Sequence, residues 1–227
     1  MPAWLNTDLM LMWLVRLMVI FLINPLHEFA HAFIAHKLGD DTAKREGRMT
    51  IDPLSHLDPF GAIFLMAFGF GWAKPVPVNP ANFKHKNLDM MFVAIAGPLM
   101  NLLAAIVGIA ALRMTGGFEV VDTQWWYCAT DGSSQGYLYW MLYQFVDVNL
   151  LLCFFNLLTI PPLDGSRVLI YFLPPKAAVW FMRYSRVFYG VMFFLLITGV
   201  LSIPLSILEL LTVRGLVWLA SFLPVVM

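Results

Sequence analysis

The sequence predicts an all-α polytopic membrane protein, a bundle of about four to six transmembrane helices with a re-entrant or extended segment on the cytoplasmic side. Hydrophobic residues make up 60% of the 227 residues, charged residues only 12%, and the mean hydropathy is +0.77. Ordinary soluble domains contain about 45–50% apolar and about 25% charged residues. This composition excludes a disordered chain, a nucleic-acid-binding protein and an ordinary cytosolic enzyme.

Four apolar stretches are each long enough for a bilayer, which requires about 20 residues. The first span, residues 9–36, is expected to break at Asn24-Pro25 because proline lacks a backbone donor. The second and third spans are residues 91–112 and 137–158. The fourth starts at residue 188 and continues past residue 203 through Pro204 into a tail, residues 205–227, that is either another crossing or an interfacial helix.

Residues 60–72 are also apolar but too few to span a hydrocarbon core of about 30 Å, because a helix rises about 1.5 Å per residue. We therefore interpret them as re-entrant or interfacial. The chain is expected to form one membrane-embedded domain over residues 1–227, with a core at about 9–170 and C-terminal helices at about 187–227.

The basic residues are distributed unevenly among the loops. Residues 37–90 hold seven and residues 164–186 hold four, whereas residues 114–136 hold none. Because basic loops stay on the cytoplasmic side, the first two are predicted to be cytoplasmic and the third, with the N-terminus, to lie outside. The sequence thus predicts an integral protein of the cell (inner) membrane with the lipid bilayer as its surroundings and no nucleic-acid partner.

Ionisable residues inside a membrane span are costly and therefore indicate function. The first span contains His27-Glu28-Phe29-Ala30-His31, in which two imidazoles four residues apart share one helix face. Two such histidines can bind one metal ion, with the carboxylate of Glu28 beside it as a general base. The alternative is that the three side chains are only hydrogen-bonded inside the helix bundle.

A catalytic zinc site usually takes three protein ligands. The best candidate for the third is Asp164, which follows Pro161-Pro162-Leu163 and precedes Gly165 at the cytoplasmic end of the third span. Equally, Asp164 could cap a helix that starts near Ser166. Arg16, in the outer part of the first span, is expected to reach the membrane surface or to pair with Asp147.

These motifs together resemble the site-2 protease family of intramembrane zinc metalloproteases. The resemblance rests on His27–His31, on the Asn156–Gly165 stretch, and on two intermediate stretches at residues 71–80 and 97–101. It extends from about residue 20 to about residue 170. Thr159 stands where the family usually has proline, so the local kink is expected to be softer.

The resemblance implies one Zn²⁺ bound by His27, His31 and Asp164, with Glu28 as the catalytic base. It also implies that Asn156 binds the substrate backbone or the developing oxyanion. The alternative for Asn156 is an interhelical hydrogen bond.

The resemblance further suggests that Lys74, Pro75, Val76 and Pro77 form an extended segment near the active site. Prolines favour extended backbone, so this segment could pair with an unwound substrate by β-addition. A plain cytoplasmic linker is the alternative.

The predicted function is that of an intramembrane zinc endopeptidase that cleaves a peptide bond in or near a transmembrane segment, and the resemblance implies membrane-anchored proteins as its substrates. A metal-ion transporter or sensor with the same ligands is the main alternative, and an inactive family member that acts as a scaffold is another. Transporters usually carry repeated halves and polar residues across several spans. Here the polar groups lie in two spans and no repeat is visible, which favours the protease.

Overall fold

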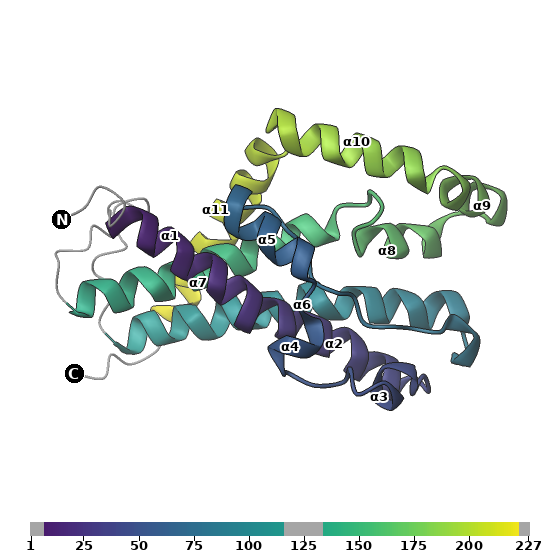
Figure 1. Cartoon of the computed structure of the whole chain (residues 1–227), viewed down its shortest axis with the longest axis horizontal. Helices are drawn as coiled ribbons and strands as arrows, with labels where there is room; N and C mark the ends of the chain where they lie inside the picture. The colour runs from purple at the N-terminus through teal and green to yellow at the C-terminus, as the bar shows by residue number, and fades with distance from the viewer. Residues whose placement is uncertain (1–6, 116–133, 223–227) are drawn as a thin grey trace.

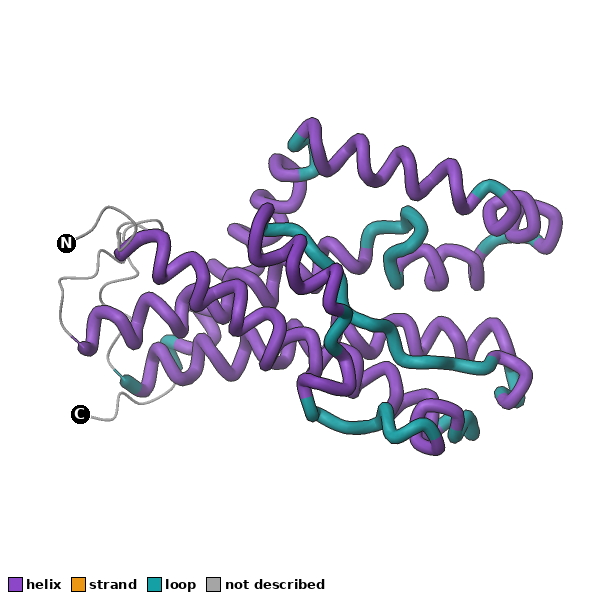
Figure 2. The backbone as a smooth tube through the Cα atoms, in the orientation of Figure 1, coloured by secondary structure: helices purple, strands orange, loops and turns teal. Residues whose placement is uncertain are grey.

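The computed structural model describes residues 7–115 and 134–222, and within these ranges every regular element is a helix (Figures 1 and 2). Four described helices are long and apolar enough to cross a membrane, or five spans if one bent pair is counted. The all-α fold class and the predicted number of spans are therefore confirmed. The predicted outer loop falls mostly on residues 116–133, outside the described residues, so the orientation in the membrane stays a prediction.

The first span is one continuous helical rod, Leu9–Lys37, built from three parts. Helix α1 covers Thr7–Met18, a π-helical turn covers Val19–Ile23, and α2 covers Asn24–Lys37. The expected break at Asn24-Pro25 is wrong. Pro25 lies in the first turn of α2, where its missing N–H costs little, and the wider π turn absorbs the irregularity just before it.

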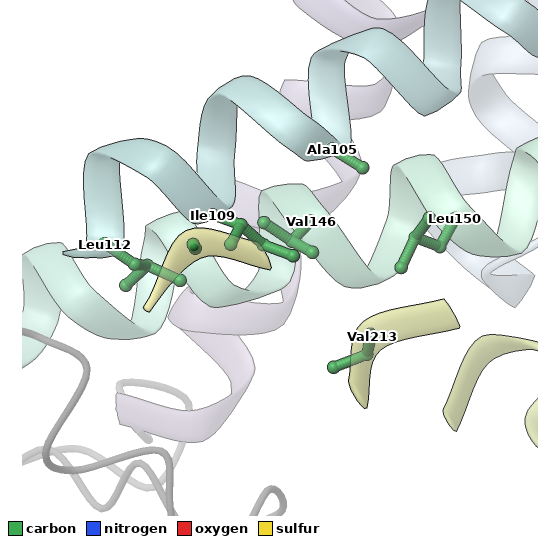
Figure 3. Close-up of a cluster of buried hydrophobic side chains, with 7 residues drawn as sticks. Ala105, Ile109, Leu112, Val146, Leu150 and Val213 are labelled. Carbon is green, nitrogen blue, oxygen red and sulfur yellow. The ribbon is translucent and has the colours of Figure 1, made fainter. Parts of the chain in front are cut away.

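Helix α6, Lys86–Met114, runs through the middle of the bundle and packs against α2, α7 and α8 (Figure 1). Helix α7, Ser134–Leu157, provides the third span. Figure 3 shows part of the cluster in which α6 and α7 meet α11, including Ala105, Ile109, Val146 and Val213. Lipid tails are as apolar as these side chains, so close packing and not water exclusion holds the helices together here.

The C-terminal part contains α8 (Gly165–Phe172), α9 (Pro175–Arg183), α10 (Ser185–Thr198) and α11 (Ser202–Ala220). Helices α9 and α10 meet at an angle of 64°. Helix α11 is long and apolar enough to cross the membrane, and it packs against α7 and α6. Of the two expectations for the C-terminal tail, its length and composition favour a further crossing.

Between α2 and α6 lie the short helices α3 (Thr42–Arg45) and α4 (Pro53–His56), then α5 (Pro59–Phe68) and the turn Pro80–Asn82. Helix α5 has 10 residues, about 15 Å, which is too short to cross a bilayer. From its end the chain runs without helix or strand to the turn at Pro80, visible as a long teal loop in Figure 2.

Arg16 does not pair with Asp147, contrary to that expectation. Its guanidinium donates to the carbonyl of Met66, in the last turn of α5. Carbonyls in the last turn of a helix have no partner in their own helix, so this one is available to a neighbouring cation. Asp147 instead lies next to Glu209 of α11.

Candidate metal centre

The two histidines lie one turn apart on α2 and face the interior of the bundle. His27 is 8% exposed, His31 is 7% exposed, and their Nε2 atoms are 3.0 Å apart. The Nδ1 atom of His31 is 2.7 Å from the carbonyl oxygen of Val93 on α6. A carbonyl only accepts, so Nδ1 of His31 carries a proton, which leaves Nε2 as the atom of this ring that can bind a metal.

The carboxylate of Asp164 meets both histidines. Its Oδ2 atom is 3.2 Å from Nε2 of His27 and 3.3 Å from Nε2 of His31. Asp164 directly precedes α8, yet its side chain makes no capping hydrogen bond. The capping interpretation is therefore wrong, and the side chain points to the histidines.

Close packing between α7 and α8 brings Asp164 into this position. Helix α7 ends at Leu157 and α8 begins at Gly165 after a short turn. A Cβ atom on Gly165 would lie 2.1 Å from the carbonyl oxygen of Leu157. Only glycine permits this approach, so the Asp164-Gly165 pair supplies both the carboxylate and the space that lets it turn back into the bundle.

Helix α6 closes the other side of the cluster with Gly97. A Cβ atom there would lie 2.4 Å from Nε2 of His31 and 2.5 Å from Nε2 of His27. The backbone of α6 is therefore in direct contact with the atoms of the two rings that face Asp164. The sequence placed Gly97 in a family-like stretch but could not show that it borders the histidines.

The three side chains fit one metal ion. One candidate ligand atom from each lies within 4.8 Å of the others. Ligands of a tetrahedral zinc ion, each at about 2.0–2.1 Å, are about 3.3 Å from one another, which matches the separations of 3.0, 3.2 and 3.3 Å.

Glu28 lies beside this cluster and is already engaged. Its Oε2 atom accepts a hydrogen bond of 2.8 Å from the backbone N–H of Val76. The predicted segment Lys74–Pro77 therefore contacts Glu28 through its backbone, and its role in substrate binding stays a prediction. Arg48 holds the first residues of this segment, because its Nη2 donates to the carbonyls of Lys74 and Pro75.

Asn156 lies near the C-terminal end of α7. Its Nδ2 donates to the carbonyl of Leu152 within the same helix at 3.0 Å, so the observed bond is not interhelical. The role of Asn156 in substrate binding stays a prediction. His36 pairs with Asp41 at 2.5 Å and takes no part in the histidine–aspartate cluster.

Sequence reasoning did not find the Val93 carbonyl, nor the two charged residues that bond the segment next to Glu28, Asp40 and Arg48. Asp40 is 0% exposed and Arg48 is 8% exposed. A backbone carbonyl leaves no signal in the sequence. A charged residue in a loop gives none either, because only the folded loop shows that it is buried.

Comparison with known proteins yields several relatives. Putative zinc metalloprotease YwhC of Bacillus subtilis is 43% identical over 152 residues, covering 66% of this chain and 65% of the relative. Putative zinc metalloprotease Rip2 of Mycobacterium tuberculosis is 29% identical over 168 residues, covering 72% of this chain and 56% of the relative. Rip2 of Mycolicibacterium smegmatis is 30% identical over 159 residues, covering 66% of this chain and 54% of the relative.

The chain is a relative of proteins named as zinc metalloproteases. It spans 65% of the length of the Bacillus relative and a little over half, 54–56%, of the mycobacterial relatives. No protein-family model matches the chain, and no solved structure matches it significantly. The names of the relatives imply Zn²⁺ as the metal, which agrees with the donor set of two imidazoles and one carboxylate.

Proposed function

We propose that the protein is an intramembrane zinc endopeptidase of the site-2 protease type. The observation that carries this proposal is the convergence of His27, His31 and Asp164 next to Glu28 inside a membrane-spanning helix bundle. His27 lies ten residues before Lys37, the end of the first span, which is about 15 Å along a helix. Peptide bonds of a membrane-embedded substrate are accessible at that depth.

The residues divide the chemistry among them. His27, His31 and Asp164 hold the zinc ion, which when bound polarises the attacking water and the scissile carbonyl. Glu28 accepts a proton from the water and passes it to the leaving amine. The Nδ1–H of His31 donates a hydrogen bond to the Val93 carbonyl, and this bond fixes the ring in the orientation that a ligand needs.

The segment Lys74–Asn79 offers an edge to an unwound substrate. Lys74 and Val76 each precede a proline, which favours extended backbone at both positions. Among the described residues nothing donates to the Val76 carbonyl and nothing accepts from the Val78 N–H. In an extended strand these two groups lie on one edge, where a substrate strand could bind between them.

The proposal is tested with the purified protein in liposomes and a peptide substrate that contains a transmembrane helix. Cleavage should require zinc, stop on addition of a chelator, and be lost in Glu28→Gln while the zinc content stays at one per chain. Zinc uptake into vesicles that is equal for wild type and Glu28→Gln, without cleavage, would overturn the proposal in favour of a transporter.

A further inference from the structure

Asp40 and Arg48 are buried charged residues outside the metal centre, and the mechanism above uses neither. Asp40 follows the end of α2, and Arg48 follows α3. Burying a charge is costly unless polar partners replace the lost water. The hydrogen-bond partners of these two residues therefore show which part of the chain each buried charge holds in place.

Asp40 connects the end of α2 to the far end of the segment Lys74–Asn79. Its Oδ2 accepts from the backbone N–H of Asn79 at 2.7 Å, and its Oδ1 accepts from Asn82 Nδ2 at 2.7 Å and from the Thr42 hydroxyl at 2.5 Å. Burial acts to raise the pKa of Asp40, but these hydrogen bonds outweigh it and hold the pKa below the usual carboxyl range. The residue is thus a carboxylate at neutral pH.

Arg48 holds the near end of the same segment. Its Nη2 donates to the Lys74 carbonyl at 2.8 Å and to the Pro75 carbonyl at 3.2 Å. The N–H of Lys74 in turn donates to the carbonyl of His56 at 2.9 Å. Both backbone groups of Lys74 are therefore fixed before the chain reaches Val76.

Val76 lies between these two anchors. Its neighbours Pro75 and Pro77 have no N–H, so Val76 is the only residue of the three that can donate from its backbone. That donor is the one bonded to Glu28 at 2.8 Å. A shift of one residue, about 3.3 Å in a strand, would place a proline nitrogen opposite the carboxylate and remove the bond.

We propose that Asp40 and Arg48 are positioning residues for Glu28. They hold the two ends of Lys74–Asn79 in register, and the Val76 N–H then fixes the orientation of the Glu28 carboxylate beside the metal centre. This inference rests on the proposed function. A positioning role differs from a role in stability alone, because the effect of Asp40 and Arg48 on catalysis would pass through the hydrogen bond from the Val76 N–H to Glu28.

The test is a double-mutant cycle with kcat, KM and zinc content measured on the full-length protein in liposomes. Val76→Pro removes the N–H, and Val76→Ala, which keeps it, is the matched control. Val76→Pro and Arg48→Met should each lower kcat about 10- to 100-fold, the loss typical of one hydrogen bond to a charged group. Val76→Ala keeps the N–H, so its kcat should exceed that of Val76→Pro by about tenfold or more, and all variants should retain zinc.

The double variant decides between the two roles. If Arg48 acts through the Val76 N–H, adding Arg48→Met to Val76→Pro should lower kcat by less than about twofold more, because the shared link is already absent. Losses that multiply, or a rise in KM with kcat unchanged, would overturn the inference. Normal kcat in Val76→Pro would do the same even if the Arg48 and Asp40 variants fail to fold.

Wild type and Glu28→Gln are run beside these variants. An active wild type and an inactive Glu28→Gln would support the proposed function, so multiplied losses would then count against the positioning role alone. An inactive wild type would instead refute the proposed function itself. Asp40→Asn gives a second, independent arm, with the same expectation of no further loss in the Val76→Pro background.

Discussion

Replacing Gly97 by alanine should damage the metal centre without harming the helix that carries the change. The new Cβ would lie 2.4 Å from Nε2 of His31 and 2.5 Å from Nε2 of His27. Carbon–nitrogen contacts of about 3.4 Å or more are normal, so one element must move by about 1 Å. His31 cannot easily yield, because its Nδ1 is hydrogen-bonded to the Val93 carbonyl.

A displacement of about 1 Å exceeds the tolerance of a zinc site, in which distances hold within about 0.2 Å. We expect zinc affinity and proteolysis to fall by about 10- to 100-fold, the range seen when the support of a metal ligand is disturbed. Helix propensity alone predicts the opposite sign, since alanine stabilises a helix by about 1 kcal/mol relative to glycine.

The assay is zinc content by mass spectrometry, with competition by a chelator, on purified protein. Gly190→Ala on α10 is the matched control, because a Cβ there would meet no atom within 4 Å. That variant should keep its zinc and its activity. Full zinc binding in Gly97→Ala would refute the placement of α6 against the two histidines.

Three further predictions concern single side chains. Glu28→Gln should keep one zinc ion per chain and lose proteolysis by about 10²–10⁴-fold, because the amide cannot accept the proton; activity and metal content are measured together. Asp164→Ala should lose both zinc and activity, and Asp164→Asn should retain part of the fold but little activity, since an amide does not offset the charge of the metal. Asp40, whose pKa is lowered by its hydrogen bonds, should stabilise the fold at neutral pH. That contribution should disappear as the pH falls below about 3.9, the ordinary carboxyl value, and Asp40→Asn should make unfolding less sensitive to pH over that range.

Different results would contradict each of these. Near-normal cleavage by Glu28→Gln would exclude it as the base, and full zinc content in Asp164→Ala would exclude Asp164 as a ligand. If the free energy of unfolding of Asp40→Asn fell with acid as steeply as that of wild type, the Asp40 carboxylate would add nothing to stability.

The part of the site that depends on local geometry was predictable from the sequence. His27 and His31 share a face because a helix repeats every 3.6 residues, whatever surrounds it. The two interpretations of Asp164 could not be separated in this way, because a cap and a turn back into the bundle differ only in how α8 packs on α7. The structure distinguishes them through the absence of a capping bond.

Interactions between distant segments were the least predictable. The expected Arg16–Asp147 pair was wrong because each residue found a different partner, the Met66 carbonyl and Glu209. Asp40 and Arg48 were missed for the same reason. Their partners are mainly backbone groups 26 to 39 residues away, which no local pattern indicates.

The π-helical turn at Val19–Ile23 rotates the two halves of the first span relative to each other around the helix axis. A π turn accommodates about one extra residue, which corresponds to a rotation of about 100° around the helix axis. Arg16 before the turn can thus face α5, while His27 and His31 after it face α6. Deleting one residue from the turn would straighten the hydrogen-bond ladder and swing one half of the rod away from its neighbour. A one-residue deletion here should therefore be far more damaging than a conservative substitution, although the turn itself carries no chemistry.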